Sequence, residues 1–445
     1  MELRLIRIIS TIIILGMINK LKTLIRYCSG HRNQTIFLIL LACFIYLRFY
    51  QLPERANLGW DQIDSAWAAK SIIVDKHILL QGVPVKNDSG IYMGPLYYYL
   101  IAPVYFLTNL DPIASPIFAG ITSVFGFSVL FYVTKKIFNT NIALIALFIN
   151  TFSFFIMSTD RVQNAIGLTM PISYMLFYFL YEVVIGEVKY LKHLAFVTGF
   201  SFHIDFTSIF YPIIIFFSLP FFPRSKKTLY SFLIAIPIFL VFLLPSIIFE
   251  LQTKHSSSSS MMNLLGASYH GFHLVRVLQL THDAFIGFLA VFQFNTILGY
   301  FAFILIPLFG IIYYFQDPKK DRLLLLYLIS LWIVVPWFVL STYSGELTNS
   351  YFSLSQDICI AILAFLTMYI FEKRNIFLTL IPTIFWSIFA IYNMQQFYDV
   401  TNGNFLGVEN TVKEAIQNKK VIPFKDKDPY SYVYYVYKWQ EKKTK

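Results

Sequence analysis

Residues 57–110 read NLGWDQIDSAWAAKSIIVDKHILLQGVPVKNDSGIYMGPLYYYLIAPVYFLTNL and place four aspartates between long apolar segments. The four are Asp61, Asp64, Asp75 and Asp88. Tryptophans and tyrosines, which settle at bilayer surfaces, flank these carboxylates. Acidic groups held at a membrane–water boundary suit chemistry on a lipid-borne substrate. This loop is therefore the first place to look for an active site.

The composition of the chain is that of a membrane protein. Of its 445 residues, 57% are hydrophobic and 13% are charged, whereas soluble domains average about 25% charged residues. The net charge of +11 does not indicate nucleic acid as a partner, because the basic residues form short clusters between apolar runs. The three cysteines lack metal-ligand spacing, and no signal peptide with a cleavage site is visible.

The apolar runs predict an all-α polytopic fold with about eleven transmembrane helices. A spanning helix needs roughly 17 to 25 mostly apolar residues. Such runs lie at 34–51, 113–134, 141–158, 165–185, 193–206, 207–222, 229–249, 296–315, 323–341, 353–371 and 376–396. The runs 193–206 and 207–222 are short, and one long broken helix is the alternative there. Residues 1–32 are predicted to form a cytoplasmic or amphipathic N-terminal segment, with an extra span or an extension upstream of a later start at Met17 as the alternatives for residues 5–19.

The distribution of lysine and arginine sets the expected topology, because cytoplasmic loops carry an excess of both. With the N-terminus inside and residues 92–110 not crossing, most basic residues between the runs fall on the inside. A crossing at 92–110 would turn every later basic cluster outward. GPLYYYLIAPVYFLTNL is therefore predicted to lie at the outer surface, within an extracytoplasmic first loop at 52–112.

On this topology the outer face collects most of the chemically active side chains. The loop STDRVQN, the turn FHIDF, the end of the seventh run and the segment STYSGELTNSYF all face outward. They contribute Asp160, Arg161, Asn164, His203, Asp205, Glu250, Lys254, His255, Glu346 and Tyr351. Few ionisable groups fall in mid-span, which argues against an ion-coupled transporter.

Each of these residues also has a purely structural interpretation. Asp61 could cap a helix, and Asp64 could favour the helix N-terminus one turn further on. Asp160 and Arg161 could be solvated loop charges, and the tyrosines at 97–99 could be interfacial anchors. The serine run 256–260 is more typical of a linker than of a site. All of these residues are nevertheless expected on the outer face of the membrane, and this shared location favours a functional site.

Several motifs in order resemble the GT-C glycosyltransferases, and most closely bacterial members of glycosyltransferase family 39. These are related to protein O-mannosyltransferases and to the aminoarabinose transferase of lipid A. The resemblance rests on LRFYQLPERANLGWDQIDSA, GPLYYYLIAP, KKIFNTNIALIALFINTFSFFIMSTDRVQNAIGLTMP, GFSFHIDFTSIFYP and LPSIIFELQTKH. It covers roughly residues 33–260. Beyond 260 only the helix count and the GEL…SYF element carry it.

The resemblance implies a GT-C fold with a catalytic membrane module at 33–260, juxtamembrane helices in the first outer loop, and variable transmembrane helices at 261–397. The donor would be a hexosyl or pentosyl group on a polyprenyl phosphate or diphosphate. The acceptor would be a protein, lipid or glycan. The expected location is the plasma (inner) membrane, with the active site on the extracytoplasmic face.

The resemblance also assigns roles to individual residues. Asp61 matches the aspartate of the first loop that acts as general base. The family often has a glutamate next to it, whereas this chain has Gln62, so Asp64 is the candidate substitute and the use of a divalent metal stays open. The remaining substrate-binding candidates are Arg161, Asn164, His203 and Glu250, with Asp160, Asp205, Tyr97 and Tyr351 beside them. The basic residue after Glu250 is displaced here to Lys254 or His255.

The chemistry is consistent with these roles. Transfer from a lipid phosphate needs a base for the acceptor, which a carboxylate supplies, and a cation for the departing phosphate. Arg161, Lys254 or His255 could be that cation, since guanidinium suits phosphate geometry. The alternatives are a flippase or other transporter of lipid-linked oligosaccharides, and a polymerase that joins them.

Residues 398–445 are predicted to form a small extracytoplasmic tail. They are too few for an independent core, and YSYVYYVY is a candidate strand. If the span count is off by one, this tail is cytoplasmic.

Overall fold

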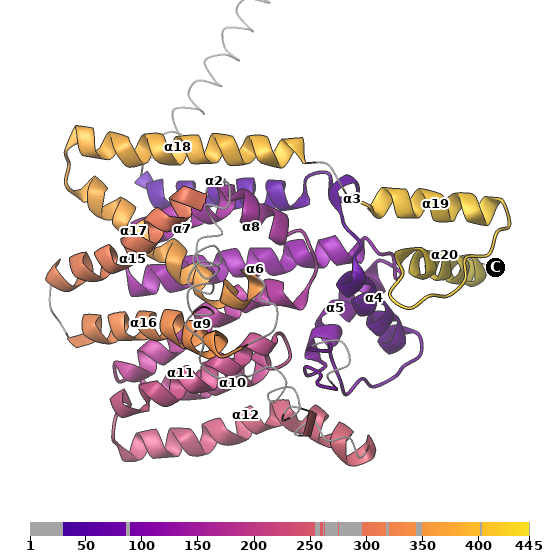
Figure 1. Cartoon of the computed structure of the whole chain (residues 1–445), viewed down its shortest axis with the longest axis horizontal. Coiled ribbons are helices and arrows are strands. Elements are labelled where there is room, and N and C mark those ends of the chain that lie inside the picture. Colours follow the sequence, from indigo (N-terminus) through magenta and orange to yellow (C-terminus); the bar gives the residue numbers. More distant parts are fainter. Residues whose placement is uncertain are drawn as a thin grey trace, which may run out of the picture.

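The computed structural model describes residues 30–85, 90–253, 259–260, 262, 275, 296–316, 320–343, 349–400 and 403–444. Every named element in this part of the chain is a helix (Figure 1). The bundle consists of α2 (Arg32–Phe49), α6 (Ala114–Ile137), α7 (Thr140–Phe152), α8 (Phe154–Thr159), α9 (Thr169–Val184), α10 (Leu191–Ser201), α11 (Phe210–Ser218), α12 (Lys226–Thr253), α15 (Thr296–Gln316), α16 (Lys320–Ser341), α17 (Gln356–Glu372) and α18 (Ile376–Asp399).

The predicted apolar runs all coincide with helices of this bundle. Among the described residues, seven helical segments are long and apolar enough to cross a membrane, namely those of α2, α6, α9, α12, α16, α17 and α18. Shorter apolar helices occupy the other runs. The run 141–158 divides into α7 and α8, and the two short runs form α10 and α11 with a turn at 202–205 between them. The expected all-helical membrane fold is confirmed.

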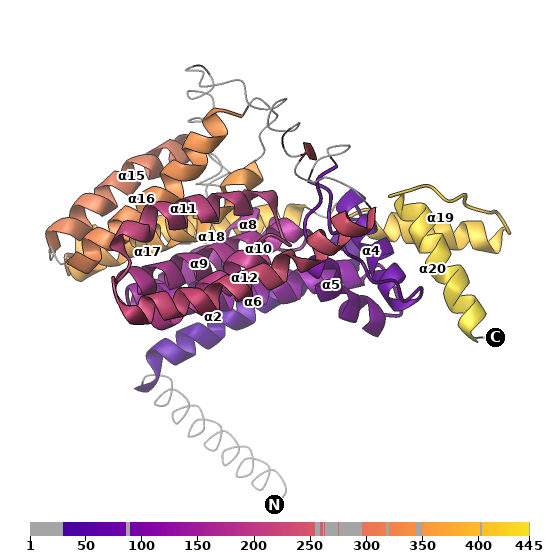
Figure 2. The ribbon, with the colours of Figure 1, turned by 90° about the horizontal axis from the view of Figure 1, so that it is seen from below.

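Five further helices gather at one end of the bundle, at the right of Figure 1 and again in the view of Figure 2. They are α3 (Leu52–Arg55), α4 (Trp60–Ile73), α5 (Leu96–Leu107), α19 (Phe405–Gln417) and α20 (Pro429–Thr444). At 1.5 Å per residue the 12 residues of α5 cover only about 18 Å, less than the roughly 30 Å of a hydrocarbon core. The tyrosine helix is therefore shorter than a full span, as are α7, α10 and α11 of the bundle.

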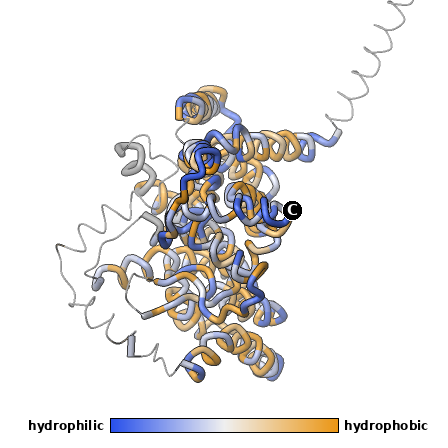
Figure 3. The backbone as a smooth tube through the Cα atoms, turned by 90° about the vertical axis from the view of Figure 1, so that its right-hand side faces the viewer, coloured by the Kyte–Doolittle hydropathy of each residue, from blue (hydrophilic) through white to orange (hydrophobic). Residues whose placement is uncertain are grey.

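The two ends of the bundle differ in character. α6 starts just after the first loop and finishes with Lys135 and Lys136 at the opposite end, as the positive-inside argument requires. Viewed toward the first-loop end, Figure 3 shows mostly hydrophobic bundle helices and hydrophilic residues around the C-terminus. The polar loops thus cap an apolar bundle on the side of the candidate aspartates.

The C-terminal tail is helical, so the strand predicted at YSYVYYVY is wrong. Within α20, Tyr432, Val433 and Val436 are buried, and this spacing places them on one helical face. That face packs on α4, where the ring of Trp67 meets Tyr432 edge-on at 5.1 Å. Burial against α4 overrides the strand preference of tyrosine and valine.

A break between α7 and α8 ties the loop after α8 to α2. The amide of Ser153 donates the last α-helical hydrogen bond of α7, to the carbonyl of Ile149, and its hydroxyl accepts from the amide of Ile156 and starts α8. The carbonyls of Asn150 and Thr151 accept hydrogen bonds from Arg48 of α2 at 3.1 and 2.9 Å. The loop after α8, which carries Asp160 and Arg161, is thereby fixed against the end of α2.

Candidate active site

Asp61 lies at the start of α4 and lines a cavity of about 290 Å³ at the first-loop end of the bundle. The walls come from α4, residues 83–85 and Met93, α5, the 3₁₀ helix Ala165–Leu168 and the turn before the 3₁₀ helix Phe206–Ile209. Three other predicted site residues line the same cavity: Tyr97, Asn164 and Asp205. The fold thus brings together side chains that are more than 140 positions apart in sequence.

The carboxylate of Asp61 faces this cavity and stays exposed to it. Within the described ranges, no backbone or side-chain group donates a hydrogen bond to it. Partial burial raises the pKa of Asp61, the neighbouring Asp64 raises it further, and Lys427 of the tail opposes the rise. A carboxyl with a raised pKa and open hydrogen-bonding sites is suited to accept a proton.

Asp64 lies one turn further along α4 and is held by two contacts. Its Oδ2 accepts a hydrogen bond of 2.6 Å from the hydroxyl of Tyr98. Its Oδ1 lies 3.8 Å from Nζ of Lys427. It is not among the residues that line the Asp61 cavity, and it ties α4 to α5 and to the tail.

Gln62 makes two structural hydrogen bonds, and the second of them requires an amide. Its Oε1 accepts from the backbone N–H of Gly59 at 2.8 Å, which completes the N-terminal cap of α4. Its Nε2 donates to the carbonyl of Gln163. A glutamate could make the first bond but, as a carboxylate, not the second. This gives a physical reason for the departure from the family pattern at this position.

Gln163 is a site residue that the sequence did not single out. Its Nε2 donates to the hydroxyl of Tyr97 at 3.1 Å, and its Oε1 accepts from the hydroxyl of Tyr105 at 3.3 Å. The side chain is buried, with 1% of its surface exposed. Only the fold reveals its role, because its partners lie on α5, some 60 positions earlier.

Asn164 and Asp205 each begin a 3₁₀ helix at the wall of the cavity. The side chain of Asn164 accepts from the amide of Gly167 at 2.8 Å. Asp205 accepts from the amide of Thr207 at 3.2 Å and also from the Thr207 hydroxyl. Burial raises the pKa of Asp205, and the bonds from Thr207 counteract that rise. Both residues therefore shape the wall, and each keeps part of its polar surface toward the cavity.

His203 lines a neighbouring cavity of about 170 Å³ that reaches Phe242 and Ser246 of α12. The two cavities share Val85, Met93 and Phe206 in their walls. Nε2 of His203 lies 2.8 Å from the carbonyl of Phe242, and Nδ1 accepts from the amide of Leu96 at 3.4 Å. Burial lowers the pKa of His203, so the ring is neutral and carries its proton on Nε2.

The two charged residues of the STDRVQN loop, Asp160 and Arg161, both form hydrogen bonds with residues near the end of α2. Nε and Nη2 of Arg48 donate to Oδ2 of Asp160 at 2.9 and 2.7 Å. The guanidinium of Arg161 donates to the carbonyls of Leu47 and Tyr50, each at 2.8 Å. These carbonyls belong to the end of α2, so Arg161 caps that helix. Neither Asp160 nor Arg161 lines the Asp61 cavity.

The remaining predicted residues are not found in the wall of the Asp61 cavity. Glu250 follows Ser246 by one turn of α12 and so shares its face. Tyr351 lies in the 3₁₀ helix Asn349–Ser355, with its ring 6.4 Å from that of Tyr343. Lys254 and His255 lie outside the described residues. Their predicted contact with the donor phosphate stays a prediction.

Comparison with known proteins agrees with this architecture. Residues 93–249 match the family model of the dolichyl-phosphate-mannose-protein mannosyltransferases. The structure is similar to that of ArnT from Cupriavidus metallidurans bound to undecaprenyl phosphate, with a TM-score of 0.55 and 10% identity over 90% of this chain and 74% of that one. The chain has the GT-C fold. No curated protein sequence matches it.

A second solved structure with this fold is the oligosaccharyltransferase AglB from Archaeoglobus fulgidus, in complex with an inhibitory peptide and a dolichol-phosphate. Its TM-score is 0.50 at 12% identity, and the match covers 92% of this chain and 60% of that one. At such low identities the likeness concerns the fold. The resemblance to the GT-C superfamily predicted from the sequence motifs is confirmed.

Metal binding in this GT-C chain was left open by the sequence. Among the described residues, no three histidine, cysteine, aspartate or glutamate side chains are grouped so that they could hold a metal ion. The cavity wall does contain the two carboxylates of Asp61 and Asp205.

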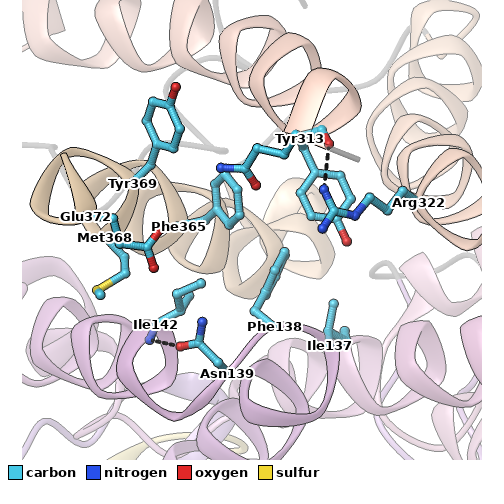
Figure 4. Close-up of a pocket in the computed structure, with 11 residues that line it drawn as sticks. Ile137, Phe138, Asn139, Ile142, Tyr313, Arg322, Phe365, Met368, Tyr369 and Glu372 are labelled. Carbon is cyan, nitrogen blue, oxygen red and sulfur yellow. Dashed lines mark hydrogen bonds between the residues drawn. The ribbon is translucent and has the colours of Figure 1, made fainter. Parts of the chain in front are cut away.

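Two other cavities lie toward the opposite end of the GT-C bundle. One of about 650 Å³ opens between α2, α7, α17 and α18 and is mostly apolar. The other, of about 180 Å³, lies between α7, α15, α16 and α17, and Figure 4 shows its aromatic lining. There Arg322 donates to the carbonyl of Tyr313 at 3.2 Å, while its guanidinium carbon lies 4.8 Å from the ring centroid. Neither cavity contains the predicted site residues.

Proposed function

We propose that this protein is an integral-membrane glycosyltransferase that moves a sugar from a polyprenyl-phosphate-linked donor to an acceptor. The observation that carries the proposal is the carboxylate of Asp61, open toward a cavity at the first-loop end of a GT-C bundle. The match of residues 93–249 to a mannosyltransferase family supports the class of reaction. The proposed site lies on the extracytoplasmic face of the plasma membrane.

In the proposed reaction, Asp61 acts as general base toward the acceptor. It takes the proton of the acceptor nucleophile, which forms a bond to the anomeric carbon of the donor sugar. The bond between that carbon and the phosphate oxygen breaks, and polyprenyl phosphate departs with the electron pair. Because phosphate is a good leaving group, no acid catalyst is needed. A single displacement inverts the anomeric configuration.

The neighbouring cavity offers a place for the lipid part of the donor. Its walls include the apolar side chains of Phe202, Phe206, Phe242 and Leu243. It adjoins the Asp61 cavity and extends along α12 toward Glu250. Lys254 and His255 follow directly after α12 and remain the proposed cations for the departing phosphate, since Arg161 is engaged with the end of α2.

The proposal is tested with purified full-length protein and polyprenyl-phosphate sugars. Wild-type protein is expected to release free polyprenyl phosphate only when an acceptor is added. Asp61→Asn removes the base with little change in shape, and we expect it to lower the rate by about a hundredfold or more. Asp75→Asn is the matched control, because Asp75 pairs with Lys70 at the other end of α4. Full activity in Asp61→Asn would contradict the role of Asp61.

The same assay separates the alternatives. A flippase would move the intact lipid-linked sugar across vesicle membranes without releasing polyprenyl phosphate. A polymerase would release it only when the acceptor is a second lipid-linked glycan. A flippase forms no bond, so it would give the carboxylate of Asp61, which is open toward the cavity, no task as a base.

A further inference from the structure

Lys427 is a tail residue that meets the candidate active site. It lies in the connection between α19 and α20, more than 360 positions after Asp61. Its Nζ lies 3.5 Å from the centroid of the Trp60 ring and 3.8 Å from Oδ1 of Asp64. Trp60 lines the Asp61 cavity. The ammonium group thus lies beside two residues of α4, of which one lines the cavity.

The tail that carries Lys427 is anchored on both sides. Before it, the side chain of Asn404 accepts from the amide of Leu58 at 2.6 Å and donates to the carbonyl of the same residue at 3.1 Å. After it, the buried hydroxyl of Tyr432 donates to the carbonyl of Leu110 at 2.9 Å. The Trp67 ring also meets Phe424 edge-on at 5.5 Å. The position of Lys427 is therefore set by the fold.

Lys427 forms part of the turn that leads into α20. Its φ of 58° lies in the left-handed region. The following residue, Asp428, accepts from the amide of Ser431 at 2.9 Å and starts α20. This turn directs the lysine toward α4 instead of away from the bundle.

The charges around Asp61 are otherwise acidic or neutral. Asp64 lies on the same helix, and Asp205 lies across the cavity. Tyr97 and Tyr98 of α5 face the carboxylates as neutral phenols, since burial raises the pKa of both. His203 is neutral and bonded to backbone groups. Within the described ranges, Lys427 is the cation in contact with this group, since Lys70 pairs with Asp75 at 2.8 Å.

We propose that the C-terminal tail completes the active site by placing Lys427 beside Trp60 and Asp64 as a positioning residue that favours the ionised form of Asp61. Lys427 offsets the charge of Asp64, so that Asp61 can lose its proton next to a second carboxylate. This inference rests on the proposed function, because an ionised Asp61 matters only if Asp61 acts as a base. An opposite charge within a few ångströms favours the ionised form of a carboxyl.

The experiment measures the protonation of Asp61 directly, in full-length protein in detergent. A hydrophobic carbodiimide reacts with protonated carboxyls, and peptide mass spectrometry gives the labelled fraction of Asp61 at each pH. Lys427→Asn removes the charge while asparagine tolerates the left-handed backbone. We expect its labelling midpoint to lie higher than that of wild type by about half a unit or more. Lys427→Arg should restore the wild-type midpoint.

The matched control is Lys413→Asn, because Lys413 pairs with Glu409 on α19, away from the site. Its midpoint should equal that of wild type, and equal protease resistance would show that the tail stays docked in each variant. An unchanged midpoint in Lys427→Asn with the tail docked would overturn the inference. A raised midpoint combined with full transfer by Asp61→Asn would instead keep the role of Lys427 and refute Asp61 as the base.

Discussion

The imidazole of His203 occupies the space in which Gly94 would carry a side chain. A Cβ built on Gly94 would lie 1.8 Å from Nδ1 and 2.2 Å from Cε1 of this ring. The amide of Gly94 also donates to the carbonyl of Phe202 at 3.1 Å. The glycine of GPLYYYL is thus in direct contact with the histidine of FHIDF. This contact joins the first loop to the turn between α10 and α11.

Gly94→Ala is therefore expected to destabilise the protein. The added methyl group must displace either a buried ring or the backbone, and overpacking of this kind costs about 1–3 kcal/mol. Thermal unfolding in detergent would measure the loss. Gly407→Ala is the matched control, because a Cβ at Gly407 within α19 has nothing within 4 Å, and alanine is favoured inside a helix. Equal unfolding temperatures for Gly94→Ala and wild type would contradict the contact.

Asp160→Asn is expected to cost about 3 kcal/mol of stability. The substitution leaves the fully buried guanidinium of Arg48 without its counter-charge, and breaking a buried pair from one side is strongly destabilising. Unfolding in a denaturing detergent would measure the change. Glu187→Gln removes one partner of an exposed pair with Lys189 and should leave stability unchanged. A small effect of Asp160→Asn would show that the Asn150 and Thr151 carbonyls satisfy Arg48 by themselves.

Gln62→Glu, which introduces the residue common in the family, is expected to impair the protein. The carboxylate cannot donate to the carbonyl of Gln163, and an unsatisfied buried acceptor costs about 1–3 kcal/mol. The loss should grow as the pH rises and the new carboxyl ionises. Stability measured across pH would show this trend. The exposed Gln417 of α19 provides Gln417→Glu as a control that should show no pH-dependent loss.

The pH dependence of transfer should reflect the raised pKa of Asp61. A base must be deprotonated, so activity should fall as the pH drops through this pKa, at a higher pH than for an ordinary aspartate. Asp64→Asn removes the like charge that contributes to the rise and should move the acid limb to lower pH. Rate measurements from pH 4 to 8 would test both statements. An acid limb that stays in place in Asp64→Asn would contradict the coupling.

Much of the fold could be predicted from the sequence, because apolar runs with the length of a span leave few alternatives. The run 34–51 became α2, whereas the surface position of α5, which rests on the count of basic residues, stays a prediction. The helical structure of the C-terminal tail could not be predicted in this way. YSYVYYVY contains strand-forming residues, and only its docking on Trp67 makes it a helix.

The carboxylates of the candidate site could be predicted from the sequence, but the bonding partners of its other residues could not. Asp61, Asp205 and Asn164 were named from local motifs, and one cavity unites them. The tasks of Arg161, Gln163 and Lys427 depend on partners roughly 60 to 360 positions away. A single sequence contains no signal for such pairings, since each residue taken alone is typical of a loop.

The double hydrogen bond between Asn404 and the backbone of Leu58 has a consequence for how the molecule is made. Residues 54–58 emerge early in synthesis, but their partners follow only after all the bundle helices have been inserted. The tail must reach the same side of the membrane as the first loop before α4 acquires its final neighbours. A chain that ends after α18 would therefore contain every residue that lines the Asp61 cavity but would lack the bonds that hold the start of α4 against the tail.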